Sequence, residues 1–231
     1  MSREPRGAAR RESVHLAAML VLTFSTGIAD AVGYLGLDKV FTGNMTGNVV
    51  ILGMGASGTT DLPVEGPVIA LAAFMAGAAL GGRTMRTHSS GTWNRTASVL
   101  LAAVGGAFAV AAVVLAVDEV EHGTAIAFGL TAVLAAAMGL QAAVARNIAV
   151  KDVTTVVVTS TITGLAADSR LGAGTENHTW ARRSGAVLLI GVGACVGALL
   201  LSVSLALAVA TPALISLAVA VVGGRMSGSA V

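Results

Sequence analysis

Long apolar stretches recur along the chain and are separated by short polar loops. An α-helix needs about 20 apolar residues to cross a bilayer. The pattern predicts four spanning helices before the last block, over residues 15–36, 67–82, 96–117 and 124–145. The last block, 185–224, is long enough for two more spans joined by a turn. We place that turn near Ser202 and Ser204, although Pro212 also interrupts the run and a single span is the alternative.

Two further apolar stretches, 44–56 and 159–167, are too short to cross a bilayer. Each follows an extended stretch that is rich in glycine or in β-branched residues. The residues expected to cap the helix N-termini are Thr42 and Asn44 in the first stretch and Thr159 and Thr161 in the second. We predict two half-helices, each of which enters and leaves the membrane on one side.

The charges of the loops alternate along the chain. Arginine and lysine dominate the N-terminus, the loop 83–95, the region 146–183 and the C-terminal end, whereas the loops 57–66 and 118–123 are acidic. Cytoplasmic loops of membrane proteins carry the excess of basic residues. This rule is satisfied if neither short stretch crosses, which predicts six spans and two cytoplasmic termini. The first half-helix would then enter from outside and the second from inside.

Composition supports a membrane protein and excludes several other classes. Of the 231 residues, 55% are apolar and only 11% are charged, whereas soluble domains carry about 25% charged residues. A soluble enzyme, a nucleic-acid-binding protein and a disordered tail are therefore excluded. A single cysteine, Cys195, allows no internal disulfide and no cysteine metal cluster. Catalytic motifs and histidine metal-ligand spacings are absent from the sequence, which predicts a protein that is not an enzyme and needs no cofactor.

Three segments of the first half resemble segments of the second half, in the same order and at nearly constant spacing. The matched pairs are 27–32 with 139–144, 40–47 with 157–164 and 77–81 with 193–197. Three spans in each half are an odd number, so the second half must be inverted relative to the first. Inverted repeats with interrupted helices are a recurring plan of secondary transporters.

The predicted fold class is an all-α polytopic membrane protein. It consists of six transmembrane helices and two re-entrant half-helices, arranged as two inverted three-helix repeats. A single transmembrane domain over 14–224 holds repeat A, 14–117, and repeat B, 123–224. A basic N-terminus, 1–13, precedes this domain and a short tail, 225–231, follows it.

The segments 27–36 and 40–48, with the sequences GIADAVGYLG and VFTGNMTGN, resemble the signature of the YoaK-like family. The later segments 138–141 and 158–163 fit the second signature of that family. The resemblance covers roughly residues 14 to 224. It implies a multi-pass protein of the bacterial cytoplasmic membrane, from a family that carries no established activity.

The candidate site lies where the two half-helices are expected to meet. Their N-termini would present free backbone N–H groups near the membrane midplane, where an anion or a polar solute can bind. Asp30 is the only acidic residue deep within a predicted span, and intramembrane acids usually bind or couple ions. The predicted solute-binding residues are Asp30, Thr42, Asn44, Thr46, Asn48, Gln141, Thr159, Thr161 and Thr163. The alternative is that these side chains only bond to the backbone and hold helices together.

We therefore expect a small secondary transporter, or a channel, for a small polar or anionic solute. The alternative function is a non-transporting assembly or regulatory protein that binds partner helices. The pairs Gly77/Gly81 and Gly193/Gly197 predict close helix crossings within or between subunits, and a homodimer through these faces is one arrangement they allow. The expected partners are the lipid bilayer and a small solute, with no nucleic acid.

Overall fold

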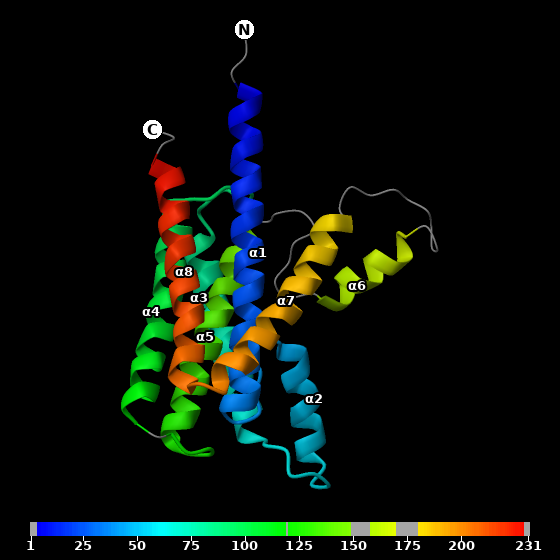
Figure 1. The fold of residues 1–231 in the computed structure, drawn as a ribbon, viewed down its shortest axis with the longest axis vertical. Coiled ribbons are helices and arrows are strands. Elements are labelled where there is room, and N and C mark those ends of the chain that lie inside the picture. Colours follow the sequence, from blue (N-terminus) through cyan, green and yellow to red (C-terminus); the bar gives the residue numbers. More distant parts are fainter. Residues whose placement is uncertain (1–3, 119, 149–157, 170–179, 229–231) are drawn as a thin grey trace.

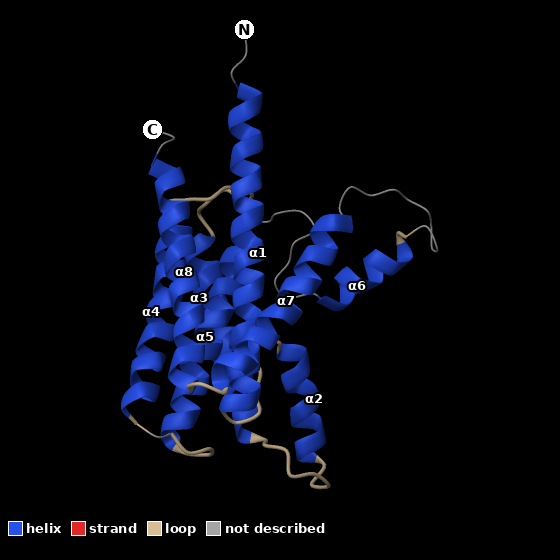
Figure 2. Ribbon diagram, in the orientation of Figure 1, coloured by secondary structure: helices blue, strands red, loops and turns tan. Residues whose placement is uncertain are grey.

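The computed structural model describes residues 4–118, 120–148, 158–169 and 180–228. This part of the chain forms eight α-helices and no strand (Figures 1 and 2). The helices are α1 (Glu4–Gly36), α2 (Met45–Ala56), α3 (Glu65–Met85), α4 (Arg95–Val117), α5 (Ala125–Ile148), α6 (Val158–Ala167), α7 (Trp180–Leu201) and α8 (Leu205–Gly228).

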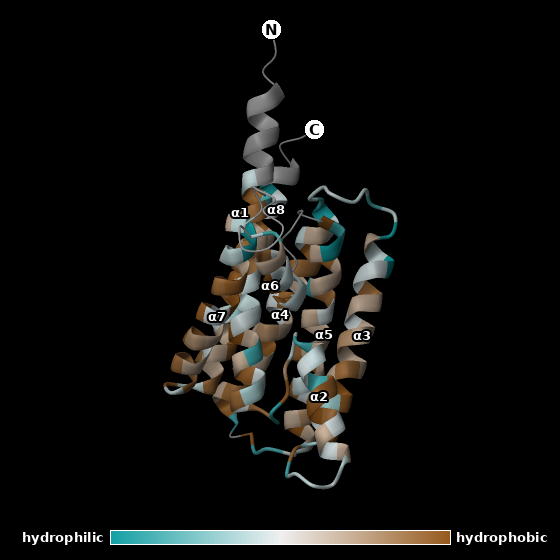
Figure 3. Cartoon of the chain, turned by 90° about the vertical axis from the view of Figure 1, so that its right-hand side faces the viewer, coloured by the Kyte–Doolittle hydropathy of each residue, from teal (hydrophilic) through white to brown (hydrophobic). Residues whose placement is uncertain are grey.

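Six of these helices are long and apolar enough to cross a membrane, and α2 and α6 are the two shorter apolar helices. The expected six helices of spanning length and two short helices are therefore present in the described part of the chain. Figure 3 shows that hydrophobic residues dominate the helices, whereas hydrophilic residues gather in the loops and at helix ends. The last apolar block forms two helices that meet at Ser202–Ser204, as expected. Pro212 lies inside α8 and does not end it.

The long helices pack in a specific set of pairs. Helix α1 contacts α7 and α8, helix α5 contacts α3 and α4, and α4 also packs along α8. The largest apolar cluster includes Ile28, Phe108, Leu134 and Val209 from four different helices, all of them buried. Burial of such side chains against one another holds the helix pairs in register.

Glycines allow two of these pairs to cross at very short distance. A Cβ atom on Gly27 would collide with the backbone of Ile190, and one on Gly193 would collide with that of Phe24. At the α3–α5 crossing, Gly77 lies against the backbone of Ala136 in the same way. The close crossings predicted from the glycine pairs therefore lie within one chain.

The first turns of α1, the last turns of α8 and the loop between α3 and α4 lie at one end of the molecule (Figure 1). The loops 57–64, 120–124 and 202–204 lie at the opposite end. The short helix α2 lies beside the half of the bundle that is nearer to this opposite end, and it packs on α3. The short helix α6 packs on α7 and has no buried residue among those described.

The loop that follows α1 is tied to the loop that precedes α5. Asp38 is buried, and its Oδ1 accepts a hydrogen bond from the backbone N–H of Gly123 at 2.8 Å. The ring of His122 lies 3.7 Å from the same oxygen. This contact joins the first half of the chain to the second at the end where the acidic loops lie.

Candidate functional site

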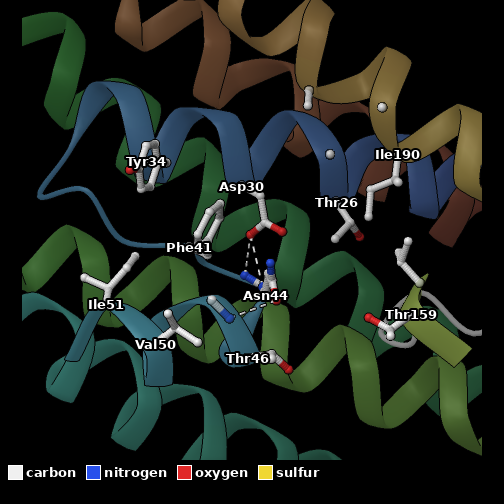
Figure 4. A pocket seen from close by; sticks show the side chains of 16 residues that line it. Thr26, Asp30, Tyr34, Phe41, Asn44, Thr46, Val50, Ile51, Thr159 and Ile190 are labelled. Atoms are coloured by element: carbon white, nitrogen blue, oxygen red, sulfur yellow. Dashed lines mark hydrogen bonds between the residues drawn. The ribbon is translucent and has the colours of Figure 1, made fainter. Parts of the chain in front are cut away.

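A cavity of about 690 Å³ lies between the two short helices. Its walls come from α1, α2, α6 and α7 and from the loop before α2 (Figure 4). Sixteen described residues line it, namely Thr26, Gly27, Asp30, Tyr34, Phe41, Gly43, Asn44, Thr46, Gly47, Val50, Ile51, Val158, Thr159, Ile190, Gly191 and Ala194. The N-terminal residues of α2 and of α6 thus face one space from segments more than a hundred residues apart in sequence.

Asp30 lies in α1 at the wall that faces the start of α2 (Figure 4). Its Oδ1 accepts hydrogen bonds from the backbone N–H of Gly43 at 2.7 Å and of Asn44 at 3.3 Å. The hydroxyl of Thr42 lies 3.5 Å from the same oxygen. Oδ2 has no hydrogen-bond partner in the described part of the chain, although the residue is only 8% exposed. One carboxylate oxygen therefore holds the loop, and the other is available to the cavity.

Asn44 caps the first turn of α2, as the sequence predicts. Thr42, the other predicted capping residue, does not. Asn44 is the N-cap residue, and its Oδ1 accepts from the N–H of Gly47 at 3.2 Å. Thr42 lies two residues before the N-cap and contacts Asp30 instead. It is buried and is not among the described lining residues.

Asn48 supports the cavity from behind. Its Oδ1 accepts from the N–H of Phe41 at 2.8 Å, and its Nδ2 donates to the carbonyl of the same residue at 2.7 Å. The side chain is fully buried, so it clamps the loop before α2 to the helix. The clamp fixes the ring of Phe41, which stacks on Tyr34 with 4.9 Å between ring centroids. Asn48 therefore shapes the cavity without lining it.

Gln141 also lies behind the cavity wall. It is buried in α5 and its Nε2 donates to the hydroxyl of Thr26 at 3.3 Å. Thr26 lines the cavity, and its hydroxyl donates to the carbonyl of Leu22 within α1. Gln141 thus contacts a lining residue but does not reach the described cavity surface itself.

On the other side of the cavity, α6 begins at Val158, so Thr159 and Thr161 lie within its first turn and do not precede it. The expected extended stretch before it lies outside the described residues. Thr159 lines the cavity. Thr163 donates to the carbonyl of Thr159 within the helix and is exposed. Thr161 and Thr163 are both outside the described lining.

Four of the nine predicted residues therefore converge on the cavity, namely Asp30, Asn44, Thr46 and Thr159. Thr42, Asn48 and Gln141 contact lining residues from behind the cavity wall, and Thr163 contacts Thr159 only within α6. Neither Thr161 nor Thr163 is in the described lining. Sequence reasoning missed the aromatic pair Tyr34 and Phe41. Tyr34 is the single tyrosine of the chain. Its spacing of seven residues from Phe41 does not predict a contact, because the two rings meet only through the fold of the intervening loop.

Comparison with known proteins places the chain among membrane proteins of unknown role. Residues 18–222 match the family described as protein of unknown function (DUF1275). The chain is 29% identical over 188 residues to the UPF0700 transmembrane protein YoaK of Bacillus subtilis (strain 168). That match covers 78% of this chain and 80% of the Bacillus protein. No solved structure matches the chain.

Proposed function

The chain belongs to the DUF1275 family of proteins of unknown function, and from that premise we propose that it is a small secondary transporter for a polar solute. The solute binds in the cavity between α2 and α6. The observation that carries this proposal is the position of Asp30, a buried carboxylate with one oxygen available to a cavity between two short-helix N-termini. A passive channel with the same architecture is a close variant.

The pairing of the helices supports two inverted repeats. If α1–α4 correspond to α5–α8 in order, the α1–α7 contact corresponds to the α5–α3 contact. The α1–α8 contact likewise corresponds to α5–α4, and α2–α3 to α6–α7. Gly27 and Gly139 occupy equivalent positions of the sequence repeat, and each lies against the backbone of the partner helix at its crossing. Inverted repeats of this kind form the substrate sites of several transporter folds.

The short helices support a re-entrant arrangement. Each is preceded and followed by a long helix, and each directs its N-terminal residues toward the same cavity. Irregular backbone at membrane depth requires protein or water to satisfy its polar groups. Asp30 and Asn48 provide such partners for the segment before α2.

Charge supports the membrane orientation. Arg83 in the last turn of α3, Arg146 in that of α5 and Arg225 in that of α8 lie at helix ends that share one side in this arrangement. The loops at the opposite end carry Asp61 and Glu121. The positive-inside rule then places both termini in the cytoplasm of a bacterial inner membrane.

The two short helices are anchored differently, which suggests how the cavity opens. The start of α2 is bonded to α1 through Asp30, whereas α6 contacts only α7 among the described helices. Asp168, which follows α6, forms an ion pair with Arg183 of α7 at 2.8 Å. Movement of α6 together with this end of α7 would open the cavity toward the basic side while α2 stays in place.

The proposal is tested with Gly191→Leu, which should narrow the cavity without disturbing the packing of the helices. Gly191 lines the cavity, and a Cβ atom on it would meet nothing within 4 Å. Gly185 of the same helix is equally open and lies outside the described lining, so Gly185→Leu is the matched control. Small amines, amino acids, nucleobases and anions are screened for a rise in the melting temperature of the purified protein.

We expect at least one compound to stabilise the wild type and Gly185→Leu but not Gly191→Leu. That compound should accumulate by counterflow in proteoliposomes, which distinguishes a transporter from a channel. The proposal fails if no compound distinguishes Gly191→Leu from its control. The alternative, a protein that binds partner helices through its glycine faces, has lost its main sequence argument, because Gly77 and Gly193 contact helices of their own chain.

A further inference from the structure

We infer that the solute of this cavity is an organic cation, with an ammonium or similar group at Asp30 and an apolar body against the surrounding wall. The inference rests on the proposed function and narrows it. It also departs from the anionic solute that the sequence allowed.

Most of the backbone donors at the start of α2 that would attract an anion are already in use. At the start of α2, the N–H groups of Gly43 and Asn44 donate to Asp30, and that of Gly47 donates to Asn44. The N–H of Met45 donates to the carbonyl of Gly43 at 3.1 Å. A helix N-terminus attracts anions through such groups. Here a carboxylate of the protein occupies that place, so a second anion would meet its charge with few donors left.

The remaining charge in the cavity is negative. Among the sixteen described lining residues, Asp30 is the only Asp or Glu, and none is a Lys, Arg or His. Its Oδ2 has no hydrogen-bond partner among the described residues. An acidic side chain within a membrane span is costly unless it finds a partner. A cationic group at Oδ2 supplies the missing partner.

The rest of the wall favours an organic cation over a metal ion. Tyr34 and Phe41 stack beside Asp30, and aromatic rings attract ammonium groups through their faces (Figure 4). Val50, Ile51 and Ile190 add apolar surface. Divalent metal ions instead require several oxygen ligands. The described residues contain no group of three His, Cys, Asp or Glu side chains that could hold such an ion.

The test compares three solutes that differ in charge and share a four-carbon body: butylammonium, butanol and butyrate. Binding to the purified full-length protein is measured by calorimetry and by thermal shift. We expect butylammonium to bind and the other two to bind at least tenfold more weakly. In Asp30→Asn the amide oxygen can still accept from Gly43, so the loop is retained while the charge is lost. This variant should bind butylammonium at least tenfold more weakly than the wild type.

A measurement on the wild type covers the case in which Asp30→Asn does not fold. A hydrophobic carbodiimide is allowed to label Asp30, and the labelled fraction is read by mass spectrometry. Butylammonium should protect Asp30 and butyrate should not. Gly191→Leu should weaken this protection, and its control Gly185→Leu should not.

The outcomes separate this inference from the proposed function. Equal or tighter binding of butyrate or butanol, sensitive to Gly191→Leu, overturns the cationic solute and leaves the solute cavity standing. Binding of butylammonium that neither Asp30→Asn nor Gly191→Leu weakens locates the cation elsewhere and also overturns the inference. If none of the three binds while other compounds of the wider screen depend on Gly191, only the inference fails. If no compound of either set depends on Gly191, both fail.

Discussion

A Cβ atom on Gly193 of α7 would lie 3.3 Å from the Cα atom of Gly27 of α1, so the two glycines face each other across the crossing. Each also lies against a backbone carbonyl of the other helix, those of Ile190 and Phe24. Close backbone approach is a main source of helix association in membranes. The crossing also forms part of the cavity, because Gly27 and Ile190 both line it.

Replacement of Gly27 by alanine should push α1 and α7 apart. The new methyl group would collide with the backbone at Ile190, which cannot change rotamer to avoid it. Overpacking of a core typically costs about 1–3 kcal/mol. We expect a lower thermal unfolding midpoint for Gly27→Ala in detergent.

Gly106→Ala in α4 is the matched control, since a Cβ atom there meets nothing within 4 Å. It should be neutral or slightly stabilising, because alanine favours the helix by up to about 1 kcal/mol. Equal midpoints for the two variants would contradict the close crossing.

The membrane arrangement predicts where single cysteines can be labelled. In a Cys195→Ala background, three exposed loop positions are changed to cysteine in turn: Thr59, Ser90 and Glu121. A membrane-impermeant maleimide should label Thr59→Cys and Glu121→Cys in intact cells. Ser90→Cys should react only after lysis, because its loop lies at the end that carries both termini.

Thr59 follows α2 and therefore tests the re-entrant helix. If α2 crossed the bilayer completely, Thr59→Cys would react from the side opposite to Lys39→Cys, an exposed position in the loop before α2. Reaction of Ser90→Cys in intact cells, with Lys39→Cys and Thr59→Cys both unreactive there, would instead reverse the orientation of the whole protein.

The bonds between Asn48 and Phe41 predict that replacement of the Asn48 amide by a carboxylate lowers the thermal stability of the protein. In Asn48→Asp the oxygen that accepts from Phe41 remains, but the Nδ2 donor to the Phe41 carbonyl is replaced by a second acceptor. A buried acceptor without a donor costs about 1–3 kcal/mol. The thermal midpoint should fall, whereas Thr163→Val, which removes an exposed hydroxyl that bonds within α6, should hardly change it. An unchanged midpoint for Asn48→Asp would show that the clamp is not formed.

The contact between Asp38 and Gly123 predicts that the loops at the acidic end stabilise the fold. Asp38→Ala removes the buried carboxylate that accepts from the N–H of Gly123, and loss of a hydrogen bond to a charged group should lower the free energy of unfolding by about 1.5–3 kcal/mol. Asp38→Asn keeps an acceptor oxygen and should be closer to the wild type. Asp61→Ala, at an exposed loop position, is the control for removal of a carboxylate. Thermal unfolding is measured for the wild type and for these three variants. An equal loss of stability in Asp61→Ala and Asp38→Ala would contradict a stabilising role of the Asp38–Gly123 contact.

Much of the fold could be predicted from the sequence because hydrophobicity and length determine what can span a bilayer. The ends of α4 differ from expectation by one residue at most, and α2 begins one residue after its predicted cap, Asn44. The turn between α7 and α8 also lies where Ser202 and Ser204 interrupt the apolar run. These features depend on local sequence, which the pattern reports directly.

The site was predicted less completely because its contacts depend on the return of the chain. Asp30 could be singled out, since an acid within a span is rare. Asp30 accepts from the N–H groups of Gly43 and Asn44 and so takes the place where an anion was expected. This contact could not be predicted, because it depends on the path of the loop 37–44. The clamp by Asn48 and the stack of Tyr34 on Phe41 depend on the same path. Thr163 was predicted to bind solute, but its hydroxyl donates to a carbonyl of its own helix. A local bond of this kind was the alternative that the sequence also allowed.

Two partners of α1, the segment before α2 and helix α7, are synthesised at very different times. Asp30 meets its backbone partners 13 and 14 residues later in the chain, so the α1–α2 unit can form as soon as it leaves the ribosome. Gly27, one helical turn away, contacts Ile190, which is about 160 residues later. At about 5–20 residues per second, this delay amounts to roughly 8–30 s. During that interval Gly27 cannot make its contact with α7, so the first half of the chain is complete before the crossing that closes one wall of the cavity can form.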